Sequence, residues 1–162
     1  MAVTTGLLAD HPEHLPTVAG WLHREWGSRR PGSSPERVAE HLKSHLGRGR
    51  LPLMVLALDG PECVGCASVR AADLEGRADL TPWLASVYVP EARRRAGIGA
   101  LLVRTAEAEA VRLGFATLYL FTSDRQGFYS ALGWNAQERA VHAGEAVTVM
   151  CRRLGGEPPP LA

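Results

Sequence analysis

Apolar positions recur along this chain with two different periods, and the alternation between them predicts a mixed α/β protein. Short apolar runs bounded by turn residues indicate strands, and apolar positions three or four residues apart indicate helices. The expected strands are residues 4–8, 53–58, 62–70, 83–89, 115–122, 134–141 and 147–153. The expected helices are residues 10–26, 33–47, 98–113 and 124–132. The predicted order of elements is therefore β-α-α-β-β-β-α-β-α-β-β.

Several local signals support this assignment. Residues 115–122 are nearly all apolar, as expected for a central strand that is covered on both faces. Ser123 and Gln126 have the spacing of a capping box, which predicts the start of the last helix. The third helix is expected to bury a stripe of apolar and small residues: Ile98, Leu101, Leu102, Thr105 and Ala108.

Length and charge limit the kinds of partner we expect. A chain of 162 residues suits one domain, which we place at 1–154, and the Gly- and Pro-rich residues 155–162 are expected to be disordered. A net charge of +1 gives no global field that would attract nucleic acid or a membrane. The N-terminus lacks a signal-peptide pattern and no apolar run is long enough to span a membrane, so we expect a cytoplasmic protein.

Two groups of residues of metal-binding types lack the partners that a metal site needs. Cys63 and Cys66 form a Cys-x-x-Cys, but in a regular strand these two side chains point to opposite faces and no second pair exists. His41 and His45 lie one helical turn apart without an evident third ligand. We therefore predict no metal site.

The segment from Val87 to Leu102 carries the clearest chemical signal. An apolar strand leads into three arginines and then into a helix start with the spacing Arg94-x-x-Gly97-x-Gly99. Unpaired amide N–H groups and the positive end of the helix dipole attract an anion at such a position. Glycines allow the main chain to approach a ligand closely, and arginine adds charge-assisted hydrogen bonds to phosphate.

Two other phosphate-binding motifs do not fit this segment. A P-loop needs Gly-Lys-Ser or Gly-Lys-Thr, and the only lysine of the chain is Lys43, far upstream. A dinucleotide fingerprint needs a third glycine at the position of Leu102 and an acidic residue where the chain has Phe121-Thr122-Ser123. A nucleotide-binding domain with another chemistry is therefore only a distant alternative.

The segment instead resembles the acetyl-CoA motif of the GNAT superfamily of N-acetyltransferases, Gln/Arg-x-x-Gly-x-Gly/Ala. A second match follows at Leu118–Thr122 and at Phe128-Tyr129-Ser130-Ala131-Leu132-Gly133-Trp134. Together the two motifs extend the resemblance over most of residues 3–153. It implies a mostly antiparallel central sheet of about six to seven strands, flanked by about four helices, in which the fourth and fifth strands splay apart.

The resemblance also implies where acetyl-CoA binds. The fourth strand would align the pantetheine arm along Val87, Tyr88 and Val89. The residues implied to hold the pyrophosphate are Arg94, Arg95, Ala96, Gly97, Ile98, Gly99 and Ala100.

For catalysis, the resemblance places Tyr129 as the acid that protonates the departing thiolate. A primary amine is mostly protonated at neutral pH, so a base is also needed. The fourth strand offers no carboxylate, and the nearest acids are Asp73, Glu75 and Asp79 in the preceding loop. We take Asp79 and Asp73 as the candidate bases.

Aromatic residues are the candidates for the acceptor pocket. Trp26 and Trp83, with Asp79, are expected to line it, and Trp21 and Tyr88 are further candidates. The predicted function is transfer of acetyl from acetyl-CoA to a primary amine in a ternary complex. A non-catalytic acyl-CoA sensor with the same fold is the alternative. The amine itself, and the choice between monomer and homodimer, stay open.

Overall fold

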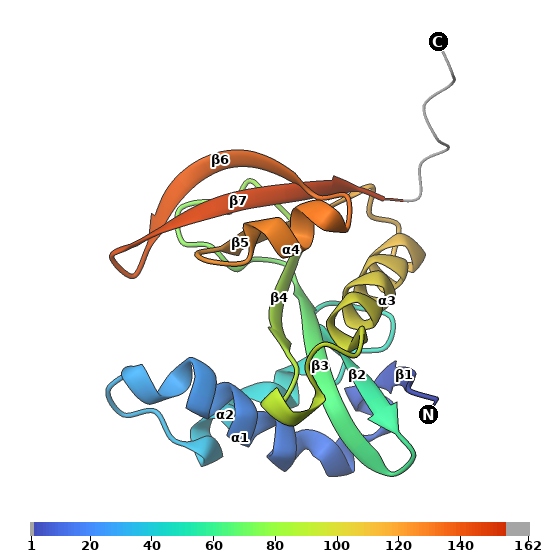
Figure 1. The fold of residues 1–162 in the computed structure, drawn as a ribbon. Helices are drawn as coiled ribbons and strands as arrows, with labels where there is room; N and C mark the ends of the chain where they lie inside the picture. The colour runs from blue at the N-terminus through green and yellow to red at the C-terminus, as the bar shows by residue number, and fades with distance from the viewer. Residues whose placement is uncertain (1, 155–162) are drawn as a thin grey trace.

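The computed structural model describes residues 2–154, which contain one open sheet in the order β1-β2-β3-β4-β5-β7-β6 (Figure 1). Neighbouring strands are antiparallel except β4 and β5, which are parallel. The strands are β1 (Thr4–Leu7), β2 (Leu53–Asp59), β3 (Glu62–Arg70), β4 (Trp83–Tyr88), β5 (Thr117–Thr122), β6 (Asn135–His142) and β7 (Glu145–Arg153). The predicted mixed fold and the predicted order of elements are confirmed.

Helices cover both faces of the sheet. They are α1 (Leu15–Glu25), α2 (Pro35–Leu42), α3 (Ile98–Arg112) and α4 (Gln126–Ala131). α1 and α2 pack on one face of β2 and β3, where Val18, Leu22 and Leu42 join Met54 and Leu56. α3 packs on the other face through a buried set that includes Ile98, Leu102, Val103, Ala106 and Ala110. No helix among residues 2–154 has the length and apolar character needed to cross a membrane.

Some predicted details are wrong at the ends and faces of helices. Ala108 is exposed, while Val103 and Ala106 are buried, so the buried stripe of α3 is rotated from the predicted one. The expected capping box is absent, because the Arg125 amide donates to Thr122 Oγ1 at 2.9 Å and the Gln126 side chain accepts from Thr148. The predicted disordered tail, 155–162, lies outside the described residues.

A bulge overturns the argument that separated Cys63 from Cys66. The register of β2 and β3 shifts at Ala57 and Leu58, so that Ala57 pairs with Gly65 while Leu58 pairs with Cys63. Both cysteines consequently pack in the same cluster beneath α1, and both are free thiols. The prediction of opposite faces is wrong, because an extra residue in a strand reverses the alternation of its side chains.

β4 separates from β5 immediately after the two strands meet. The only residue pair of their ladder is Trp83 with Tyr119, supported by a 3.0 Å bond from the Tyr119 amide to the Pro82 carbonyl. On its other side, β4 bulges against β3, and Ser86 within the bulge takes a left-handed conformation with φ 54°. A bulge bends the strand that carries it, so it helps to turn β4 away from β5. The predicted splay is confirmed.

The first turn of α3 is held close to the end of β4. Gly65 makes this possible, because a Cβ there would lie 2.8 Å from Leu102 Cδ1 and 3.1 Å from the Tyr88 carbonyl oxygen. Figure 1 shows the result: α3 begins beside the point where β4 ends, and the β5–β7 half with α4 opens away from the β1–β4 half.

Candidate functional site

The connection from β4 to α3 presents a row of unused main-chain donors. Gly97 caps α3 at φ 79°, and Arg95 is also left-handed at φ 66°. Within residues 2–154, the amide N–H groups of residues 95–100 donate to no main-chain carbonyl. Consecutive open amides at a helix start form a concave donor set that fits phosphate oxygens. The predicted anion site therefore has the donors that it needs.

The two motif glycines have different structural roles. A Cβ at Gly97 would meet no atom within 4 Å, so the side-chain space is open and the left-handed backbone is what favours glycine. A Cβ at Gly99 would lie 3.3 Å from Phe128 Cζ. Gly99 therefore lets α4 approach α3, a packing role that the ligand-based argument for this glycine did not include.

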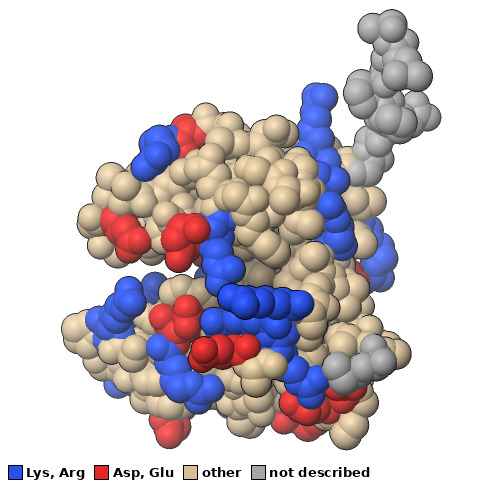
Figure 2. All heavy atoms as spheres, in the orientation of Figure 1, with Lys and Arg blue, Asp and Glu red and all other residues tan. Residues whose placement is uncertain are grey.

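The three arginines of the motif do not act as one group. Arg93 turns toward the β2–β3 hairpin and pairs with Asp59 at 2.9 Å and with Glu62 at 2.8 Å. Arg94 donates from Nε to the Val89 carbonyl at 2.8 Å, and its guanidinium lies 5.7 Å from the centre of the Tyr88 ring. Arg95 is exposed. Figure 2 shows arginines gathered over this connection at the centre of the view.

The edge of β4 that faces β5 carries no ladder after Trp83. Main-chain groups at such an edge can pair with an extended ligand as an added strand would. Val87, Tyr88 and Val89 are partly buried there, directly before the open amides of the α3 start. An extended ligand that ends in a phosphate group thus fits this arrangement, with its extended part along the edge of β4 and its phosphate at the open amides.

Tyr129 lies on α4 with 9% of its surface exposed. Its ring contacts Phe128 and Trp134 at centroid distances of 5.0 and 6.0 Å. Burial raises the pKa of Tyr129 to about 12, so the phenol stays protonated at neutral pH. Its hydroxyl makes no hydrogen bond to any residue of 2–154, which leaves a donor for a bound molecule.

A buried carboxylate holds this part of the site together. Glu107 on α3 accepts from Trp134 Nε1 at 3.0 Å and pairs with Arg104 at 3.0 Å and Arg152 at 3.3 Å. The Arg152 guanidinium also donates to the Leu132 carbonyl and lies where a side chain at Gly133 would be. Glu107 and Arg152 were missed by sequence reasoning, because a helix glutamate and a strand arginine look like solvated charges.

The two candidate bases lie in different environments. Asp73 has 15% of its side chain exposed and pairs with Arg70 Nη1 at 3.3 Å. Burial raises the pKa of Asp73, with Arg70 opposing the shift. Arg70 Nη2 also donates to Ser86 Oγ at 3.4 Å, which ties Asp73 to the bulge of β4. Arg70 gave no sequence signal, since it simply ends a strand.

Asp79 pairs with a different arginine from Asp73. Its two carboxylate oxygens accept from Arg77 at 3.0 and 3.1 Å, and Arg77 also pairs with Glu138 on β6. Hydrogen bonds from Arg77 lower the pKa of Asp79, which makes it a weaker base than an ordinary carboxylate. Of the two acids, Asp73 is the one that the structure links to β4.

The two tryptophans predicted to line the acceptor pocket differ in their exposure to solvent. Trp83 is fully buried, donates to the Leu80 carbonyl at 2.6 Å and packs against Tyr119 and Phe121. It has no surface with which to contact an acceptor, so its assignment to the pocket wall is wrong. Trp26 is 45% exposed and lies 6.3 Å from the Tyr88 ring.

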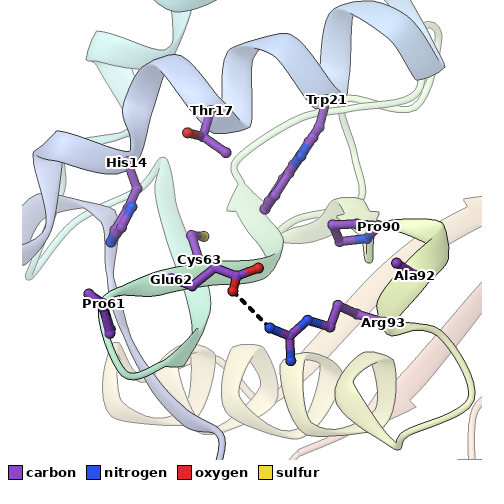
Figure 3. A pocket seen from close by; sticks show the side chains of 9 residues that line it. All are labelled: His14, Thr17, Trp21, Pro61, Glu62, Cys63, Pro90, Ala92 and Arg93. Atoms are coloured by element: carbon purple, nitrogen blue, oxygen red, sulfur yellow. Dashed lines mark hydrogen bonds and ion pairs between the residues drawn. The ribbon is translucent and has the colours of Figure 1, made fainter.

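Two hollows flank the end of β4. One, of about 420 Å³, lies between α1, the start of β3 and the turn at Glu91–Arg93, where Figure 3 shows Trp21 facing the Glu62–Arg93 pair. The other, of about 540 Å³, is lined by Arg94, Ala96 and Ile98 beside the open amides. In the described part of the chain, no group of three His, Cys, Asp or Glu side chains is arranged to hold a metal ion.

Solved structures with the same fold extend over almost the whole chain. An aminoglycoside 6'-acetyltransferase type Ii is 23% identical with a TM-score of 0.74, covering 98% of this chain and 100% of its own. An aminoglycoside 6'-N-acetyltransferase in complex with coenzyme A is 20% identical with a TM-score of 0.74, covering 98% and 99%. A putative acetyltransferase from Salmonella typhimurium with its cofactor acetyl-CoA is 16% identical with a TM-score of 0.68, covering 100% and 99%.

A search of curated protein sequences found no match. Among protein-family profiles, the one described as "Acetyltransferase (GNAT) family" matches residues 15–134. That range contains the splayed β4, the open amides at the start of α3 and the Phe128–Trp134 motif. It spans well over half of the sequence, and the chain therefore belongs to the acetyltransferase (GNAT) family.

Proposed function

We propose that this protein transfers the acetyl group of acetyl-CoA to a primary amine by direct attack in a ternary complex. One observation carries the proposal: the unpaired edge of β4 leads straight into the open amides of residues 95–100. This succession matches a pantetheine arm followed by a pyrophosphate. The family to which the chain belongs supports acetyl transfer as the reaction.

The cofactor-binding residues follow from this succession. Val87, Tyr88 and Val89 would align the pantetheine arm along the edge of β4. The amides of residues 95–100 would bind the pyrophosphate, with Arg95 supplying positive charge. Arg94 would keep its bond to the Val89 carbonyl and brace the turn between the strand and the helix.

When bound, acetyl-CoA supplies a thioester whose carbonyl carbon accepts the amine and whose sulfur leaves as a thiolate. Asp73 would take the proton of the incoming ammonium group, because burial raises its pKa and so makes it a stronger base than an ordinary carboxylate. Tyr129 would hold its proton until the carbon–sulfur bond breaks and then donate it to the sulfur. Asp79 is not needed in this scheme.

Acetyl transfer to a panel of amines tests the function. We expect purified protein with acetyl-CoA to release free thiol with at least one amine of the panel, at a rate proportional to enzyme concentration. The panel should include small amines, amino acids, aminoglycosides, polyamines and peptides. Binding of acetyl-CoA without thiol release from any of them would instead support the acyl-CoA sensor.

The pyrophosphate site is tested by Gly97→Ala. Alanine in a left-handed conformation costs roughly 1–2 kcal/mol, and relaxation of the backbone would move the amides out of line. We expect CoA affinity to fall at least about fivefold in calorimetric titration, a change of about 1 kcal/mol. Gly76→Ala is the control for CoA affinity, because Gly76 has φ 83° with open space around it and lies in the loop between β3 and β4, outside residues 95–100. Equal CoA affinity in the two variants would contradict the assignment.

Tyr129→Phe removes the proposed acid while keeping the ring that packs against Phe128 and Trp134. We expect kcat to fall by about 10²-fold, with KM for acetyl-CoA nearly unchanged, since a general acid acts in the chemical step. Steady-state kinetics by thiol release measures both constants. A wild-type kcat in Tyr129→Phe would remove this residue from the mechanism.

The choice of base predicts a pH dependence. Asp73 acts only when deprotonated, and its pKa is raised, so kcat/KM should fall on the acid side at a higher pH than an ordinary carboxylate would give. Asp73→Asn should abolish that limb and lower the rate by about 10²-fold or more. Asp79→Asn should leave the profile in place. Superimposable pH–rate profiles for Asp73→Asn and the wild type would rule out Asp73 as the base.

A further inference from the structure

Charged side chains gather on one face of the sheet, in front of the point where β4 leaves β5. Arg70 and Trp83 are paired in register, so both lie on the face covered by α1 and α2. Arg70 joins Asp73 and Ser86 on that face. Tyr119 pairs with Trp83, which places it and Phe121 on the same face of β5. This face is the side from which an acceptor can reach the divergence of the strands.

Segments from both halves of the molecule bring an arginine and a histidine to this face. Arg30, in the connection between α1 and α2, interacts electrostatically with Asp73 and with His41. His142, at the end of β6, also acts on Asp73 and packs its ring 4.8 Å from Phe121. Arg30 and His142 thus approach the single carboxylate of Asp73 from opposite sides of the divergence.

Arg70 and Arg30 differ in how far their guanidinium donors are already used by partners. Arg70 is held by Asp73 and Ser86 and is largely shielded from solvent. Arg30 is exposed and makes no ion pair with any residue of 2–154. A guanidinium in this position keeps all its donors for a carboxylate or another planar anion. Arg30 is therefore the group best placed to bind a negative charge on the acceptor.

The segment around Arg30 is also rich in positive charge. Residues 24–37 carry Arg24, Arg29, Arg30 and Arg37 against Glu25 and Glu36. Figure 2 shows a cleft between the two halves, with blue side chains and a red patch on its lower lip over α1 and α2, and red patches beside a blue one on the upper lip. The upper half exposes the acids Asp124 and Glu145 together with Arg125 and Arg139. The arginine-rich segment of residues 24–37 thus favours an anion.

We propose that the acceptor is a primary amine that also carries a carboxylate, and that Arg30 binds this carboxylate. The inference rests on the proposed acetyl transfer and specifies its substrate class. A molecule with several ammonium groups and no carboxylate, such as an aminoglycoside, would meet repulsion from Arg30, Arg70 and their neighbours. Although the chain shares its fold with aminoglycoside acetyltransferases, we therefore do not expect it to share their substrate.

Matched acceptors isolate the contribution of the carboxylate. We would compare 4-aminobutyrate with butylamine and 6-aminohexanoate with hexylamine, because the two members of each pair have similar amine basicity. An aminoglycoside, kanamycin, and an amidated peptide with an internal glutamate complete the set. We expect kcat/KM from thiol release to be at least about tenfold higher for the carboxylated member of a pair, the size of effect that one charge-assisted pair provides. Comparing the free amino carboxylates with the peptide shows whether the carboxylate belongs to a small molecule or to a side chain of a peptide.

Arg30→Gln tests the residue. We expect it to raise KM for the carboxylated acceptor about tenfold, to leave kcat nearly unchanged and to change the kinetics of the amine without a carboxylate little. Arg29→Gln removes the same charge one residue away and should keep the wild-type preference. Because Arg30 is exposed, thermal unfolding of both variants should match the wild type, which separates a loss of recognition from a loss of fold.

The possible failures are distinguishable. The inference is overturned if kcat/KM for butylamine, hexylamine or kanamycin equals or exceeds that for the carboxylated acceptors. Acetyl transfer to an amine would still stand in that case. If the preference exists but survives Arg30→Gln, the assignment of Arg30 is overturned. If no amine of any kind releases thiol, the proposed function fails and the inference fails with it.

Discussion

β4 and β5 run parallel in one sheet but pair only at Trp83 and Tyr119, so the strands beyond that pair leave main-chain groups without ladder partners. Exposing such groups is costly unless water or a ligand satisfies them. The divergence is stabilised on one side by the buried Trp83 and on the other by the bulge at Ser86. Every proposed function of the site, from the binding of an extended chain to the approach of an acceptor, depends on this separation.

The two sides of the divergence are held by different interactions. On the α3 side, Glu107 links α3 to Trp134 and Arg152, and Trp134 packs against Tyr129. On the opposite face, Arg70 connects Asp73 to Ser86 in β4. The proposed proton donor, Tyr129, and the proposed proton acceptor, Asp73, are thus each held by interactions with a charged residue that belongs to neither motif. Positioning of this kind limits the loss of side-chain entropy when substrates bind.

Arginines serve separate purposes because their partners differ. Arg93 fixes the turn before α3 to the β2–β3 hairpin, and Arg94 closes the turn onto the end of β4. Arg77 occupies Asp79 and joins the loop before β4 to β6. Arg30 is exposed, with no ion pair inside residues 2–154. The net charge of the whole chain therefore does not reveal how its individual arginines are used.

The sequence by itself determined the order of elements, the glycine-capped start of α3 and the family, because these follow from hydrophobic period and from contiguous motifs such as Arg94-x-x-Gly97-x-Gly99. Only the tertiary structure decided which side chains meet across elements. It buried Trp83, turned Cys63 and Cys66 to one face, gave Gly99 a contact with Phe128 and separated Asp73 from Asp79. Bulges, register and long-range ion pairs produce these outcomes, and no local pattern of residues encodes them.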